Sequence, residues 1–173
     1  MHEQKPSKII VFDEARFGTH TKTGYGWFKK GGRTQVPVKL GYKNFYLYGG
    51  VDIKDGSNFN LFLPKCNTEN MNVFLSELSK EYPEDRISMI MDGAGWHKSK
   101  GHIVPANIKI IYLPPYSPEL NPVERLWLYI KKNVLSNRIY EELEDLEISL
   151  CGFIMSLDNA VVKNICSANY LAI

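Results

Sequence analysis

Two short apolar runs, residues 9–12 and 87–91, constrain the fold of this 173-residue chain more than any other feature. A continuous apolar run of this length predicts a strand that is buried on both faces, and therefore a central strand. Between the two runs, residues 68–82 carry apolar side chains at helical spacing, with Thr68 as the expected N-cap and Pro83 beyond the end. A strand, a helix and a strand form a right-handed crossover, so the second strand should run parallel to a neighbour.

The other segments complete an α/β pattern. Alternating or apolar stretches bounded by Gly-Gly and Asp-Gly turns predict further strands, and two amphipathic stretches close the chain. The expected strands are 25–29, 45–53, 58–63 and 108–113, and the expected helices lie near 122–135 and 140–157. Gly49-Gly50 indicates a bulge or a close approach. The sequence predicts one domain over residues 1–173, with a mixed sheet of about five strands flanked by helices.

Composition and charge narrow the class of protein. Hydrophobic residues make up 44% of the chain, and the three cysteines lack CxxC spacing, which argues against a disulfide framework or a structural zinc site. No apolar run approaches the length of a membrane span, so we expect no membrane partner and a cytoplasmic, nucleoid-associated location. The net charge is only +2, but residues 15–51 hold seven Lys or Arg and no acid. Such a segment can attract phosphates, although a solvated hairpin has the same composition.

Three carboxylates are placed where chemistry could use them. Asp13 and Asp92 each follow an apolar run, and Glu124 lies in the first turn of the helix near 122–135. Ligands collect outside the carboxyl ends of parallel strands. Each acid also has an ordinary explanation: the aspartates suit turns, and Asn121 with Glu124 suits a capping box. Taken together, they predict a site for two Mg²⁺ ions, which favour hard oxygen ligands and neutralise charge during phosphoryl transfer.

Three blocks of sequence resemble a known family. They are VFDEARFG at 11–18, MDGAGWHKS at 91–99 and LPPYSPELNPVERLW at 113–127. In this order they resemble the catalytic domain of DDE transposases of the mariner superfamily, in its bacterial insertion-sequence branch (insertion sequence 630 type). The resemblance implies a ribonuclease H-like fold, with Asp13, Asp92 and Glu124 as catalytic residues that hold two Mg²⁺ or Mn²⁺ ions. Thirty-one residues separate Asp92 from Glu124, slightly fewer than is usual for the family.

The resemblance also implies an activity and partners. Water would cleave DNA at a transposon end, and the freed 3′-hydroxyl would then attack target DNA, with a homodimer expected in the active state. Such transposases usually carry N-terminal helix-turn-helix domains, and the first expected strand leaves no room for them here, so the chain is expected to be a fragment, a separately encoded half or a remnant, and a separately encoded end-binding domain is one candidate partner. A non-catalytic DNA-binding remnant and a ribonuclease H-like nuclease acting on RNA–DNA hybrids remain alternatives.

Several basic or aromatic residues are candidates for DNA contact. Residues 25–33 interleave aromatic and basic side chains, which suits stacking and phosphate contact but equally suits a half-buried hairpin. His97 follows Asp92 closely and could contact the scissile region, or could instead cap or form an ion pair. Arg125 could pair with a phosphate or with Glu119. The DNA-binding candidates are Arg16, Lys29, Lys30, Arg33, His97, Lys98 and Arg125.

Overall fold

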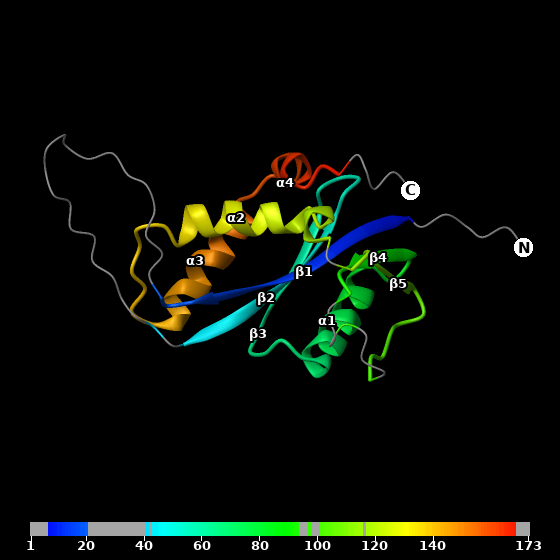
Figure 1. Ribbon diagram of the computed structural model, residues 1–173, viewed down its shortest axis with the longest axis horizontal. Coiled ribbons are helices and arrows are strands. Elements are labelled where there is room, and N and C mark those ends of the chain that lie inside the picture. The colour runs from blue at the N-terminus through cyan, green and yellow to red at the C-terminus, as the bar shows by residue number, and fades with distance from the viewer. Residues whose placement is uncertain are drawn as a thin grey trace, which may run out of the picture.

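The computed structural model describes residues 7–20, 41, 43–93, 97, 101–115 and 117–168. Five strands form one mixed sheet in the order β3-β2-β1-β4-β5 (Figure 1). This architecture confirms the predicted α/β class. The predicted strand at 25–29 and its Gly-Gly turn lie outside the described residues.

The first three strands form an antiparallel meander. Strand β1 (Lys8–Gly18) pairs with β2 (Asn44–Asp52), which pairs with β3 (Asn58–Leu63). The turn between β2 and β3 contains Gly56 at φ +80, where glycine avoids the strain that a side chain would cause. These strands were predicted, but β1 is longer than expected. It continues through Asp13 because its pairing with β2 extends to Gly18, so the prediction that Asp13 ends the strand is wrong.

The crossover unit adds the parallel half of the sheet. Helix α1 (Thr68–Glu81) connects β3 to β4 (Ile87–Met91), which runs parallel to β1, and β5 (Ile108–Tyr112) runs parallel to β4. The N-cap of α1 is Asn67, whose side chain accepts from the backbone N–H of Asn70. Thr68 is therefore the first helical residue and not the cap, because the side-chain oxygen of Asn67 already accepts from the N–H of Asn70.

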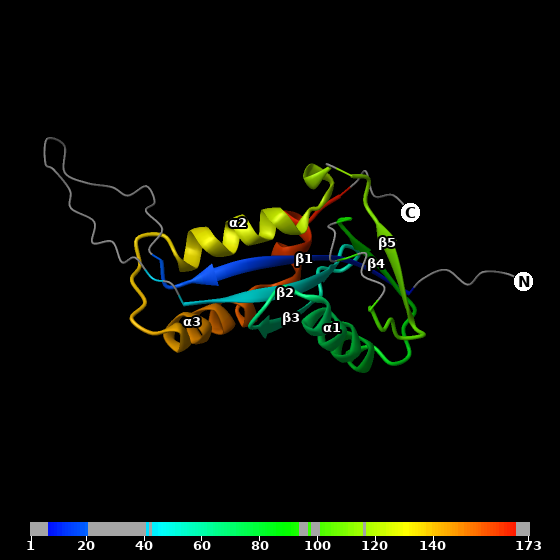
Figure 2. The same cartoon turned by 60° about the horizontal axis from the view of Figure 1, so that its bottom comes forward.

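Three helices follow β5. They are α2 (Val123–Val134), α3 (Leu143–Met155) and the short α4 (Asn159–Ile165), and a 3₁₀ turn, η1 (Pro118–Leu120), precedes α2. Helix α4 and the turn were not predicted. In both views α2 runs alongside β1 (Figures 1 and 2). The apolar face predicted for α2 is confirmed by its buried residues, which are Val123, Leu126, Trp127, Ile130 and Val134.

Side-chain alternation along β1 separates two cores. Ile9, Val11, Ala15 and Phe17 pack with residues of α2, α3 and α4, whereas Ile10 and Phe12 pack with residues of α1. Figure 1 shows α1 on one side of the strands and α2 and α4 on the other. Because successive side chains of a strand point to opposite faces, Asp13 belongs to the α2 face and Glu14 to the α1 face.

Within the described residues, no single helix is long and apolar enough to cross a membrane. Helices α3 and α4 reach that length and composition only together, and they are bent by 96° at the break between them. Leu146 and Leu150 of α3 and Val162 of α4 lie in the protein core.

Candidate active site

Asp13 lies where the sheet splits. The parallel pairing of β1 with β4 ends at Val11, two residues before Asp13, while the pairing with β2 continues opposite Gly49. Beyond Val11, β1 is therefore no longer paired with β4. Asp92 directly follows the last residue of β4, so the two aspartates lie at the same edge of the sheet, as the carboxyl ends of parallel strands do.

Trp127 of α2 holds the Asp13 carboxylate. The indole Nε1 donates a hydrogen bond of 2.8 Å to Asp13 Oδ2. The ring fits against β2 because position 49 is a glycine: a Cβ there would lie 2.4 Å from Trp127 Cη2. The close approach predicted for Gly49-Gly50 is confirmed, and the continuous register of β1 with β2 shows no bulge.

Asn121 fixes the start of α2 against β1. Its buried amide donates from Nδ2 to the carbonyl oxygen of Phe12 at 3.1 Å, and its Oδ1 accepts from the N–H of Val123. The residue preceding the helix is Pro122, which has no side-chain cap. The predicted capping box of Asn121 with Glu124 is therefore wrong, because the Asn121 side chain bonds the strand and the N–H of Val123. Glu124 is exposed in the first turn of α2.

The electrostatics of Asp13 place the three acids in one neighbourhood. The pKa of Asp13 is raised to about 7: burial is the largest cause, the negative charges of Glu14, Glu124 and Asp92 add to it, and the hydrogen bond from Trp127 opposes it. Mutual repulsion of this kind is expected where carboxylates share a site without a cation. Within the described part of the chain, however, no three His, Cys, Asp or Glu side chains lie close enough together to hold a metal ion.

The donor chemistry nevertheless fits a hard divalent cation. All three groups are carboxylates, the ligands that Mg²⁺ and Mn²⁺ favour. The Asp92 side chain is 49% exposed and Glu124 lies on the surface of a helix turn, so both can change rotamer. A cation would remove the repulsion that now raises the pKa of Asp13. Asp13, Asp92 and Glu124 are the residues that would hold it.

On the opposite face, a second polar cluster surrounds Glu14. Glu14 Oε2 lies 3.2 Å from His97 Nε2, and Glu14 Oε1 accepts from Cys66 Sγ at 3.3 Å. His97 Nδ1 contacts both the backbone oxygen and the carboxylate of Asp92. Burial opposes protonation of the His97 ring, but Glu14 and Asp92 outweigh it, and the pKa of His97 is raised. Sequence reasoning missed Glu14, although it directly follows Asp13.

The residues predicted to contact DNA differ in their exposure and in their partners. Arg16 is exposed on β1. His97 is only 1% exposed, and its ring is occupied by protein groups, as the ion-pair alternative anticipated. Arg125 donates from Nη2 to the carbonyl oxygen of Ser167 at 2.6 Å, a partner that the sequence did not suggest. The remaining candidates, Lys29, Lys30, Arg33 and Lys98, lie outside the described residues.

A basic hollow lies at the far end of β1. It measures about 450 Å³ and is lined by Arg16, His20, Lys43 and Lys131, among other residues. Lys43 also pairs with Glu142 at 2.8 Å, and Lys131 Nζ lies 5.3 Å from the centre of the Phe17 ring. Arg16 is three residues from Asp13, which is about 10 Å along a strand.

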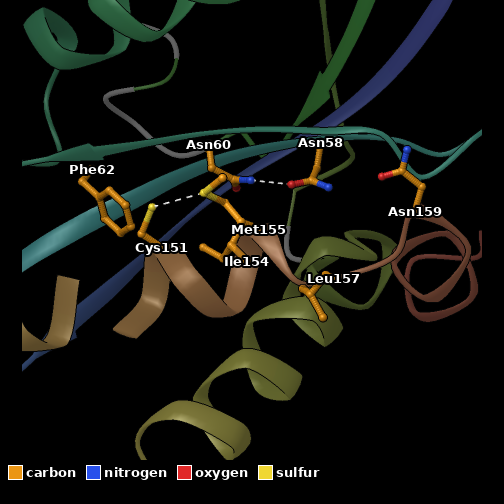
Figure 3. Close-up of a pocket in the computed structure, with 8 residues that line it drawn as sticks. All are labelled: Asn58, Asn60, Phe62, Cys151, Ile154, Met155, Leu157 and Asn159. Atoms are coloured by element: carbon orange, nitrogen blue, oxygen red, sulfur yellow. Dashed lines mark hydrogen bonds between the residues drawn. The ribbon is translucent and has the colours of Figure 1, made fainter. Parts of the chain in front are cut away.

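A different hollow, of about 350 Å³, lies between β3 and α3. Figure 3 shows Asn58 and Asn60 of β3 on one side and Cys151, Ile154 and Met155 of α3 on the other. None of the described residues that line it has a carboxylate, histidine or basic side chain. This hollow therefore lacks the groups that phosphoryl transfer needs, and the cluster around Asp13 is the better candidate for catalysis.

Comparison with known proteins agrees with this geometry. A family model described as DDE superfamily endonuclease matches residues 8–147. The uncharacterized protein y4pE/y4sA of Sinorhizobium fredii (strain NBRC 101917 / NGR234) is 40% identical over 108 residues, which cover 62% of this chain and 80% of that protein.

Solved structures share the fold. The Mos1 transposase paired-end complex with the left transposon end superposes with a TM-score of 0.70 at 19% identity, covering 92% of this chain and 51% of that one. The mariner Mos1 paired-end complex with Mn gives 0.69 at 18% identity, over 92% and 51%. A simian T-cell lymphotropic virus intasome gives 0.56 at 14% identity, over 84% and 47%. The predicted ribonuclease H-like fold is thereby confirmed, and the chain spans about half the length of the Mos1 chains.

Proposed function

This chain belongs to the DDE superfamily of endonucleases, and we propose that it is the catalytic domain of a transposase that cleaves and joins DNA. The observation that carries the proposal is the match of residues 8–147 to this family, a stretch that holds Asp13 on β1, Asp92 directly after β4 and Glu124 in the first turn of α2. The charges of Glu124 and Asp92 both act on Asp13, where they raise its pKa together with burial and the larger effect of Glu14. We also propose that the chain belongs to the bacterial insertion-sequence branch of these transposases.

The reaction is phosphoryl transfer. In cleavage, a water oxygen bonds to phosphorus, the bond from phosphorus to the 3′ oxygen breaks, and a proton ends on that oxygen. In strand transfer, the freed 3′-hydroxyl oxygen bonds to a phosphorus of target DNA, and the target's own 3′ oxygen leaves with the proton. Divalent cations, when bound, would neutralise the charge on the attacking and leaving oxygens.

The residues of the chain supply position. Trp127 donates to Oδ2 of Asp13, and Asn121 bonds the start of α2 to the backbone of Phe12. These two contacts hold the first turn of α2, which carries Glu124, beside the strand that carries Asp13. Both Mos1 complexes with Mn and with Mg have this fold. We therefore assign Asp13, Asp92 and Glu124 to two Mg²⁺ or Mn²⁺ ions, and DNA to the surface around them.

The basic hollow supports DNA as the substrate. Arg16, His20, Lys43 and Lys131 lie along β1 and α2 beyond the acids, where the backbone of a bound duplex would need neutralisation. We propose that this hollow receives a phosphate of the DNA. A homodimer and a separate end-binding domain remain part of the proposal for the whole transposase.

The test is nicking of supercoiled plasmid DNA in the presence of Mn²⁺ by the wild-type chain and by Asp92→Ala. Nicking by the wild type alone supports the enzyme. Equal background in both supports the alternative of a non-catalytic DNA-binding protein. Cleavage of an RNA–DNA hybrid in preference to DNA would instead indicate a ribonuclease H-like nuclease.

A further inference from the structure

A chain of contacts lies on the α1 face of the sheet, on the other side of β1 from the Asp13 side chain. It runs from Cys66 through Glu14 and His97 to Asp92, so it links the α1 face of β1 with the end of β4. Only Asp92 of these four has a part in the proposed reaction. Burying an ionic pair costs desolvation energy that its own attraction often fails to recover. Stability is therefore a weak explanation for the His97–Glu14 pair.

The contacts fix the orientation of the His97 ring. Nε2 faces a Glu14 oxygen and Nδ1 faces Asp92 oxygens. All of these oxygens accept hydrogen bonds, so both ring nitrogens donate. Tyr112 donates from its hydroxyl to the backbone oxygen of His97 at 2.8 Å, and the Phe12 ring meets the imidazole edge-on, with centroids 6.1 Å apart.

Glu14 is held in its turn. One carboxylate oxygen faces His97 and the other accepts from the Cys66 thiol. Glu14 is on the same strand as Asp13 and points to the opposite face. Glu14 therefore fixes the His97 ring relative to β1, the strand that carries Asp13.

The His97 ring in turn restrains Asp92. His97 Nδ1 contacts the backbone oxygen of Asp92 at 3.1 Å and also its carboxylate, so it restrains the main chain and the side chain together. Asp92 needs such restraint because it has left β4 and its side chain is half exposed. Partners that orient a metal-binding carboxylate typically change metal affinity by about 10–100-fold.

We propose that Glu14 and His97 are a positioning pair: Glu14 orients the His97 ring, and the ring holds Asp92 at the end of β4, where Asp92 can meet a divalent cation beside Asp13. This inference depends on the proposed function for the role of Asp92. It assigns to His97 a contact inside the protein and not a contact with DNA.

The test measures Mn²⁺ affinity by calorimetry and Mn²⁺-dependent nicking in the same variants. His97→Asn keeps an amide nitrogen near the place of Nδ1, whereas His97→Gln places one near Nε2. We expect His97→Ala and His97→Gln to weaken Mn²⁺ binding by about 10–100-fold, and His97→Asn to stay within about threefold of wild type. At saturating Mn²⁺ the nicking rate of all three should approach the wild-type rate.

Glu14 supplies the matched pair of variants. Glu14→Ala should weaken Mn²⁺ binding about tenfold or more, and Glu14→Gln should restore most of the affinity, because its amide oxygen still accepts from Nε2. In the His97→Asn background, Glu14→Gln should add nothing further. Glu77→Gln, an exposed change on α1, is the control and should leave both readouts at wild type.

The outcomes separate the two proposals. Wild-type nicking by Asp92→Ala would overturn the proposed function. Loss of nicking in Asp92→Ala together with wild-type Mn²⁺ affinity in His97→Ala and Glu14→Ala would overturn the positioning pair and leave the function standing. If Glu14→Ala fails to fold, equal Mn²⁺ affinity in His97→Asn and His97→Gln would overturn it instead.

Discussion

Asp13 and Glu14 are neighbours on one strand, yet the two faces of the sheet treat their charges differently. On the α2 face, Asp13 is largely buried, receives one neutral hydrogen bond, from Trp127, and lies in the field of Glu14, Glu124 and Asp92. On the α1 face, Glu14 meets the imidazole of His97 and the thiol of Cys66. Asp13 thus has no cationic partner among the described residues, whereas Glu14 lies beside a histidine whose pKa is raised.

The largest contrast is expected in catalysis. Asp13→Asn keeps the shape of the side chain and can still accept from Trp127, but it removes a ligand from the proposed metal site. We expect Mn²⁺-dependent plasmid nicking to fall about thousandfold, since the charge stabilisation that such sites supply is lost. Glu14→Gln should reduce nicking only a few-fold at low Mn²⁺. Comparable losses in both variants, each shown by circular dichroism to be folded, would contradict the division of roles.

The pH dependence of metal binding should follow Asp13. Its pKa is raised to about 7, so below that pH a cation must displace a proton from the carboxyl group. Mn²⁺ affinity measured by calorimetry should fall about tenfold for each pH unit below 7 and level off above it. An affinity that is constant between pH 5.5 and 7.5 would show that Asp13 is already ionised, or that it does not bind the ion.

The same shift has a consequence for the metal-free protein. The folded state binds the Asp13 proton more tightly than the unfolded state does, so this group loses its stabilising effect as pH rises from the ordinary value of 3.8 to about 7. Asp13→Asn removes that dependence. At pH 8 without metal, we expect the variant to unfold at a temperature a few degrees above wild type, as followed by thermal melts. A lower melting temperature at pH 8 would contradict the prediction.

Trp127→Phe tests the single donor on the α2 face. The substitution keeps an aromatic ring in the core, gives up the indole atoms that lie against Gly49, and removes the hydrogen bond that lowers the pKa of Asp13. Nicking at pH 7 should fall about fivefold, as expected for the loss of about 1 kcal/mol, and should recover as pH is raised toward 8.5. If the loss of activity were the same at every pH, Trp127 would act by packing alone.

The basic hollow should give the smallest effect. Lys131→Gln removes one positive charge from its lining, so DNA binding should weaken modestly and the slope of log affinity against log salt should shrink by about one. Filter binding or fluorescence anisotropy over a range of salt concentrations measures this slope. Lys80→Gln, on α1, is the matched control, and an equal change of slope in both variants would remove the hollow from the DNA path.

The sequence predicted what depends on local patterns. The central strands, the crossover, the buried face of α2 and the close approach at Gly49 follow from apolar runs, helical spacing and glycine. The length of β1 did not follow, because Asp13 and Glu14 interrupt the apolar pattern. That strand continues only because β2 supplies hydrogen bonds beyond the point where β4 separates from it.

The contacts between distant segments could not be predicted in this way. Asp13 and Trp127 are 114 positions apart and Glu14 and His97 are 83 apart, so no periodicity connects them. The Asn121 side chain accepts locally from the N–H of Val123, but it also bonds the backbone of Phe12, which becomes its neighbour only after folding. Arg125 likewise fitted a phosphate contact, and its observed partner is the carbonyl oxygen of Ser167.

Anomalous diffraction from crystals grown with Mn²⁺ tests the central claim most directly. We predict two anomalous peaks about 3.5–4 Å apart, coordinated by Asp13, Asp92 and Glu124, with Trp127 still bonded to Asp13. Peaks elsewhere, or none at these residues while Glu124 is well ordered and turned to solvent away from both aspartates, would contradict the account.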